Sequence, residues 1–153
     1  MRILASLFLL LLILLLIAHT YWRHKQGKAA TDAKRIMYKE LDKKAKEGDL
    51  TSMYRFAELF YEENDEDYFQ LIFKWTSLLA ACKQDPSVFL ALGDMLLSGY
   101  GTEKDPKRAL SCYEQSLSAD ILLGAKSNLS REAHNYVEEQ IIKLRQTLDQ
   151  PTN

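Results

Sequence analysis

Apolar residues form one continuous run near the N-terminus and then six shorter stretches in which they recur every three or four positions. The continuous run extends from Ile3 to Ala18 and is interrupted only by Ser6. The periodic stretches fall within residues 33–45, 53–61, 71–82, 88–96, 109–117 and 133–148. Such spacing is typical of one face of an α-helix, and no stretch alternates strictly as a half-buried strand does. The sequence therefore predicts an all-α chain with a transmembrane helix followed by six helices.

Residues 3–22 are predicted to anchor the protein in a membrane. A helix of this length rises about 30 Å, which is the thickness of the hydrocarbon core of a bilayer. Tyr21 and Trp22 then occupy the position of an interfacial aromatic belt, and the basic segment 23–28 follows. A cleaved secretory signal is the alternative interpretation, but residues 18–20 make a poor cleavage site.

The distribution of Lys and Arg around the apolar run predicts the orientation. Residues 23–42 contain six basic side chains, whereas the N-terminal side has only Arg2 and the terminal amine. The positive-inside rule then places the body on the cytoplasmic side, with a bacterial inner membrane as the expected location. The periplasmic side is the alternative.

Composition argues against several classes of function. The net charge is −1, so bulk charge does not indicate nucleic-acid binding. This total combines +4 in residues 1–28 with −5 in residues 29–153, from 16 basic and 21 acidic side chains. The two cysteines and three histidines are scattered, without the spacing of a zinc site. No nucleophile or nucleotide motif is present, so we expect no enzyme activity, no cofactor and no small-molecule substrate.

Aspartates mark the predicted helix starts. Asp85 and Asp105 each precede a proline, which is the order of an N-cap and a first helical residue. Asp49 begins an earlier helix in the same way, and it lies 36 residues before Asp85. The same offset pairs residues 56–60 with 92–96, and an offset of 37 or 38 pairs Trp75 with Cys112 or Tyr113. A helix pair repeated at this period predicts a short α-solenoid.

The second copy, L-G-D-M-L-L-S-G-Y-G-T-E-K-D-P-K-R-A-L-S-C-Y from residue 92, resembles the Sel1-like repeats, which are relatives of the tetratricopeptide repeats. The match extends over about 30 residues of the 34–40 that such a repeat spans. The positions that carry it are Leu92, Gly93, Gly99, Gly101, Asp105, Ala109 and Tyr113. The first copy is degenerate: it has Ala57, Trp75 and an Ala80-Ala81 pair, but no glycine in its turn.

This resemblance implies an adaptor that holds other proteins. A few secreted members of the family have been linked to enzymatic activity, and a secreted enzyme is the remote alternative. Those members are rich in cysteine, unlike this chain. We expect Cys82 and Cys112 to be free thiols that pack as small apolar groups.

The repeat pattern assigns structural roles to its most conspicuous residues. Ala57 and Gly93 are small where two helix backbones approach, and Trp75 and Tyr113 fill the core between repeats. Gly99 is expected to end a helix in a left-handed conformation. The stretch around it, residues 98–105, is a hinge between two helices, because a phosphate-binding loop would follow a strand.

The predicted organisation has five parts. They are an anchor with its basic flank (1–28), a first amphipathic helix (29–48), a degenerate repeat (49–84), a Sel1-like repeat (85–120) and a C-terminal capping helix with a tail (121–153). Residues 26–31 are expected to link the anchor to the first helix.

These features predict a non-catalytic, membrane-tethered scaffold that binds a protein partner, itself membrane-associated, on the concave face formed by the first helices of the repeats. The residues predicted to bind the partner are Tyr54, Arg55, Glu58, Tyr61, Leu90, Asp94 and Leu97. The alternative is an accessory subunit of a larger membrane complex that packs through its transmembrane helix.

Overall fold

The chain folds entirely into helices, turns and loops over the residues that the structure describes. The computed structural model describes residues 2–149, together with the side chains of residue 13 and residues 15–149. No strand occurs in this range, which confirms the predicted all-α class. The chain divides into two compact units, Met1–Glu40 and Leu41–Asn153.

The first helix, α1, runs without a break from Arg2 to Lys46. The prediction of a linker at residues 26–31 is therefore wrong, because this segment is helical. The segment contains one glycine and no proline, and its other residues include alanine, lysine and glutamine, which favour helices. A single glycine costs about 1 kcal/mol, which is too little to end a helix that is favourable on both sides.

The predicted membrane anchor comprises residues 3–22. The side chains of residues 3–12 and 14, which make up most of it, lie outside the described part of the structure. Within the part of the chain that is described, no helix has a stretch long and apolar enough to span a bilayer.

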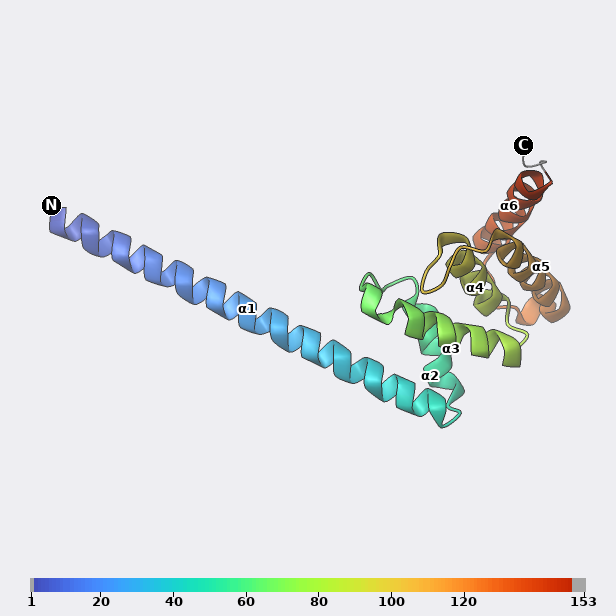
Figure 1. Ribbon diagram of the computed structural model, residues 1–153, viewed down its shortest axis with the longest axis horizontal. Coiled ribbons are helices and arrows are strands. Elements are labelled where there is room, and N and C mark those ends of the chain that lie inside the picture. Colours follow the sequence, from blue (N-terminus) through green and yellow to red (C-terminus); the bar gives the residue numbers. More distant parts are fainter. Residues whose placement is uncertain (1, 150–153) are drawn as a thin grey trace. The chain divides into compact units, whose positions relative to one another are not determined.

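Five further helices follow α1 (Figure 1). They are α2 (Leu50–Leu59), α3 (Phe69–Cys82), α4 (Pro86–Ser98), α5 (Pro106–Leu123) and α6 (Arg131–Leu148), with short 3-10 turns at η1 (Glu66–Tyr68) and η2 (Gly124–Lys126). They coincide with the last five periodic stretches of the sequence, and the first stretch lies in the final turns of α1. The periodicity therefore located the last five helices correctly, whereas the separate helix predicted at residues 29–48 is the C-terminal part of α1.

The predicted aspartate caps are present. The Asp49 carboxylate accepts a hydrogen bond from the backbone N–H of Ser52, and Asp105 accepts one from that of Arg108. Asp85 accepts from the N–H groups of both Ser87 and Val88. Each cap satisfies N–H groups that the first turn of a helix cannot pair internally.

Helix α4 lies at the centre of the second unit and packs against α3 and α5, and α5 in turn packs against α6. Leu92 on α4 and Ala109 on α5 are buried in this core. Ile141 and Leu144 of α6 belong to the same apolar cluster, in agreement with the predicted role of α6 in covering the second helix pair.

Helices α4 and α5 approach each other closely at Gly93. A Cβ atom placed on Gly93 would lie 2.7 Å from Cε1 of Tyr113, which is well inside van der Waals contact. The hydroxyl of Tyr113 donates a hydrogen bond of 2.7 Å to Oδ1 of Asp94, the residue after this glycine. The small residue and the aromatic ring predicted from the repeat are thus direct neighbours.

The first helix pair repeats part of this arrangement. Ala57 lies seven residues after the start of α2, as Gly93 lies seven after the start of α4, and both are buried. Trp75 is buried, stacks on Phe56 at a centroid distance of 6.3 Å and donates its Nε1–H to Oδ1 of Asp42 at 3.0 Å. Trp75 is therefore a core residue, as predicted.

The loop between α4 and α5 inserts an aromatic ring into the first helix pair. Gly99 ends α4 with a left-handed φ of 79°, as predicted. Tyr100 stacks on Phe69 of α3 at 3.8 Å between centroids and meets Phe60 edge-on at 4.9 Å. Gly101 has a φ of 66°, and a Cβ atom there would lie 2.2 Å from the Phe69 carbonyl oxygen. Only glycine allows the loop to approach α3 so closely.

The two cysteines are free thiols. Cys112 is buried on α5, as predicted. Cys82 is exposed at the end of α3, so the expectation that it packs as an apolar group is wrong. Leu79 and Ala80 in the same last turn are buried, but Cys82 and the residues on either side of it face away from the core.

We predict that Gly93→Ala lowers the free energy of unfolding by about 1–3 kcal/mol, because the new methyl group must displace the Tyr113 ring. Thermal unfolding of the full chain in mild detergent, followed by circular dichroism, measures the effect. Gly27→Ala is the matched control, since nothing lies within 4 Å of its added Cβ atom. Equal stability of Gly93→Ala and the wild type would contradict the close contact.

Candidate functional site

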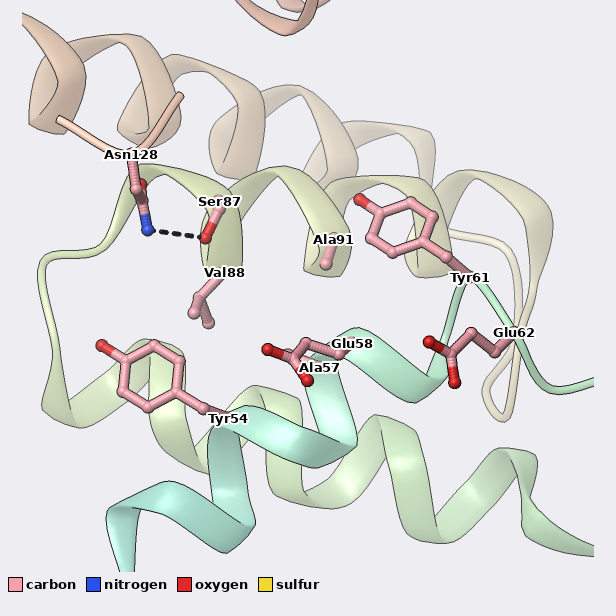
Figure 2. Close-up of a pocket in the computed structure, with 9 residues that line it drawn as sticks. All are labelled: Tyr54, Ala57, Glu58, Tyr61, Glu62, Ser87, Val88, Ala91 and Asn128. Atoms are coloured by element: carbon pink, nitrogen blue, oxygen red, sulfur yellow. Dashed lines mark hydrogen bonds between the residues drawn. The ribbon is translucent and has the colours of Figure 1, made fainter. Parts of the chain in front are cut away.

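A pocket of about 420 Å³ lies between α2 and α4 (Figure 2). The residues that line it are Tyr54, Ala57, Glu58, Tyr61, Glu62, Ser87, Val88, Ala91 and Asn128. We call this pocket the α2–α4 groove. It is formed by the first helices of the two helix pairs, the turn that follows α2 and one residue of the loop before α6.

Helical spacing explains which side chains reach the groove. Tyr54 and Glu58 are four residues apart on α2, so they share one stripe, and Tyr61 follows in the turn just after the helix. Figure 2 shows this stripe facing Val88 and Ala91 on α4. Ala57 and Ala91 are buried and small, and they leave the space between the helices that the larger side chains surround.

A polar cluster around Asp85 forms one end of the groove. Its Oδ2 accepts a hydrogen bond of 2.9 Å from the hydroxyl of Tyr54. Nδ2 of Asn128 lies 3.0 Å from Oδ1 of Asp85 and 3.0 Å from Oγ of Ser87, the second of which is drawn in Figure 2. These bonds tie the loop before α6 to the start of α4 and to α2.

The ionisation of Asp85 is stabilised by this cluster. Burial by itself would raise the pKa of Asp85, but the hydrogen bonds from Asn128, Ser87 and Tyr54 outweigh it and hold the pKa below its ordinary value of 3.8. For Tyr54, burial and the adjacent Asp85 carboxylate raise the pKa to about 12. The end of the groove therefore carries a negative charge at neutral pH.

The rim of the groove is acidic. Glu58 and Glu62 both line it, and Arg55 bonds to each of them at 3.0 Å. One guanidinium thus faces two carboxylates, and the nine lining residues include no lysine or arginine. Charge on this rim favours a ligand that carries a cation.

A second hollow continues the groove on the other side of α2. It has a volume of about 370 Å³ and shares Tyr54 and Glu58 with the first. Leu41 and Lys44, near the end of α1, form part of its wall. The two hollows together present a surface that crosses α2 from α4 to the end of α1.

Asp94 lies on α4 in a cluster with Tyr113 and Tyr136. Its Oδ1 accepts hydrogen bonds from the hydroxyls of Tyr113 at 2.7 Å and Tyr136 at 2.9 Å. Burial raises the pKa of Asp94 above its ordinary value, although these two hydrogen bonds oppose the shift. Asp94 therefore joins α4, α5 and α6 and does not line the groove.

The structure brings together some of the residues predicted to bind a partner and separates others. Tyr54, Glu58 and Tyr61 line the groove, and Arg55 lies at its rim through its ion pairs. Tyr61 is 62% exposed, so its ring is available for contact. Leu90 is buried in the core and Leu97 packs half-buried against it. Neither of these leucines, nor Asp94, reaches the groove.

The sequence analysis predicted a binding role for three of the nine lining residues and missed the other six, which include the polar residues Glu62, Ser87 and Asn128. Glu62 lies in a turn, Ser87 lies in the first turn of α4 and Asn128 lies in an irregular segment, so none of these three falls on an apolar stripe. Asn128 reaches Asp85 across 43 residues of sequence. No local pattern signals such a contact, and only the polar loop around Asn128 could have drawn attention to it.

Comparisons with protein-family models, curated proteins and solved structures found no match to this chain. Among the described residues, no three His, Cys, Asp or Glu side chains are grouped as a metal site would require. The functional interpretation therefore rests on the α2–α4 groove and on the sequence.

We predict that Asp85→Asn and Asp94→Asn have opposite effects on stability at pH 7. The folded state lowers the pKa of Asp85, so its charge stabilises the fold above pH 3.8, and this contribution disappears as the pH falls through the lowered pKa. Asp85→Asn should thus cost about 1 kcal/mol at neutral pH. The folded state raises the pKa of Asp94, so stability is lost as the pH rises from 3.8 through the raised value. Asp94→Asn should avoid this loss.

Unfolding of both variants by urea between pH 3 and pH 8 measures these contributions. The two differences from the wild type should have opposite signs at pH 7, and both should shrink toward pH 3. A destabilised Asp94→Asn at pH 7 would show that the carboxylate charge itself is needed there.

Proposed function

We propose that the protein is a membrane-tethered helical-repeat scaffold whose α2–α4 groove binds a segment of a partner protein. The observation that carries this proposal is the groove itself, which is open and is lined by exposed aromatic and charged side chains. Tyrosine and arginine are frequent among the residues that contribute most to protein–protein binding. Tyr61 is exposed beside the groove, and Arg55 is at its rim.

The repeat interpretation supports a binding role. Helix pairs that stack along a solenoid place their first helices side by side and form a concave surface. The pairs α2–α3 and α4–α5 each begin at an aspartate cap and have a small buried residue at the same helical position. This correspondence agrees with the resemblance of residues 92–113 to a Sel1-like repeat. We propose on this basis that residues 49–120 are two stacked repeats.

The partner segment is proposed to be basic. Glu58 and Glu62 outnumber Arg55 at the rim, and Asp85 adds a charge at the end of the groove. A lysine or arginine of the partner would contact these carboxylates and could also lie over the ring of Tyr61. The groove crosses only two helix pairs, so it would hold a short segment.

The membrane tether is proposed from the sequence. Residues 3–22 have the length and composition of an anchor, and the basic flank 23–28 favours a cytoplasmic body. A partner in the same membrane would be held at a high effective concentration, which compensates for a small interface.

We predict that Tyr61→Ala and Glu58→Lys each reduce recovery of the bound partner about tenfold or more, since the first removes an exposed aromatic contact and the second places a cation in an acidic groove. Cross-linking in intact membranes, purification in mild detergent and quantitative mass spectrometry would identify and measure the partner. Leu78→Ala and Glu139→Lys are matched controls, because both residues are exposed on other helices. If both groove variants recovered every bound protein as well as the wild type does, the groove would be excluded as the binding site.

We predict that Cys82 reports the orientation of the body. Its thiol is exposed, whereas Cys112 is buried, so a maleimide should react at Cys82 alone. In intact bacterial cells a membrane-impermeant maleimide should label the protein only after the inner membrane is permeabilised. Cys82→Ser, which should remain unlabelled, is the control. Labelling with only the outer membrane opened would place the body in the periplasm.

A further inference from the structure

The hairpin of α5 and α6 has an apolar groove on its outer side. This groove has a volume of about 680 Å³. Leu117 and Ile121 line it from α5, and Ile141 and Ile142 line it from α6. Ile121 is 75% exposed and Ile142 is 58% exposed. Large apolar side chains that gather in an open groove are typical of an interaction surface.

The two charged residues of α6 that line the groove are placed symmetrically around the two isoleucines. Glu138 precedes Ile141 by three residues, and Arg145 follows Ile142 by three. All four line the same groove, so they form one stripe along the helix. A helix with this order is complementary to an antiparallel copy of itself, because the acid of each helix then faces the base of the other.

We propose that this surface binds a second copy of the chain, with the two α6 helices antiparallel about a twofold axis at Ile141 and Ile142. A twofold contact uses the same patch on both chains, and it therefore requires a self-complementary surface. In this arrangement Glu138 of each copy faces Arg145 of the other. Each α6 lies in the groove between α5 and α6 of the opposite chain, and the exposed isoleucines are covered.

The contacts already made by these charges allow the additional pairing. Nη2 of Arg145 bonds to Oε1 of Glu114 on α5 at 2.7 Å, and a guanidinium has five N–H donors. Oε1 of Glu138 lies 3.6 Å from Nε2 of His134 on the same helix. Both charged side chains remain more than half exposed, at 60% for Arg145 and 56% for Glu138. The surface is on α5 and α6, so this proposal is independent of the α2–α4 groove.

The full chain in mild detergent tests the proposal by sedimentation or by light scattering coupled to size exclusion. We expect a dimer at micromolar protein concentration. Ile142→Asp should raise its dissociation constant about a hundredfold, because two carboxylates would enter the centre of the interface. A wild-type monomer at these concentrations overturns the proposal.

Charge reversal tests the register of the two helices. Glu138→Arg and Arg145→Glu should each weaken the dimer about tenfold or more, since both ion pairs become repulsive. An equimolar mixture of the two variants should associate again as a heterodimer, because each arginine then faces a glutamate. The controls are Glu139→Arg and Lys143→Glu, which make the same changes in charge on α6 outside the groove.

The possible results are distinct. Weakening by the groove variants but not by the controls, with recovery in the mixture, supports the antiparallel pairing. A dimer that none of the groove variants weakens is held by another surface, and this overturns the proposal. Failure of the mixture to associate, when each variant alone is folded and monomeric, overturns the assignment of Glu138 to Arg145.

Discussion

The close approach of α4 and α5 is the constraint on which the rest of the second unit depends. Gly93 leaves room for the ring of Tyr113, and the ring carries a hydroxyl that reaches Asp94. Tyr136 of α6 bonds to the same carboxylate oxygen. One small residue thus sets the spacing of two helices and aligns a third. With α4 fixed in this way, its opposite side is free to face α2 across the groove.

Most of the fold could be predicted from local patterns in the sequence. The apolar stripes located the helices, and Asp49, Asp85 and Asp105 marked their starts, because periodicity and capping depend on neighbours a few residues away. The segment 26–31 was predicted wrongly, because it has no apolar stripe from which a helix could be inferred. Its residues were interpreted as a polar linker, although nothing in them ends a helix. The exposure of Cys82 depends on which helices pack beside the end of α3. The spacing of apolar residues within α3 does not reveal this.

The candidate site was only partly accessible from the sequence. Tyr54 and Glu58 share a stripe on α2 and Tyr61 comes directly after this helix, so their common surface could be predicted. The burial of Leu90 could not be predicted, because α4 is apolar on both faces and both are buried in the fold. The place of Asn128 in the groove depends on its contact with Asp85, which lies 43 residues earlier in the sequence. Such a contact can be recognised only once the fold is known.

Tyr100 has a consequence for how the second unit folds. This residue belongs in sequence to the second helix pair, yet its ring lies between Phe60 and Phe69 of the first. A fragment ending at residue 84 would retain the two phenylalanines without the ring that contacts both of them. The pairs are therefore not interchangeable modules, and a recombination event that exchanged one of them would have to carry this loop along with it. Cooperativity between the pairs passes through a connecting loop as well as through the faces of the helices.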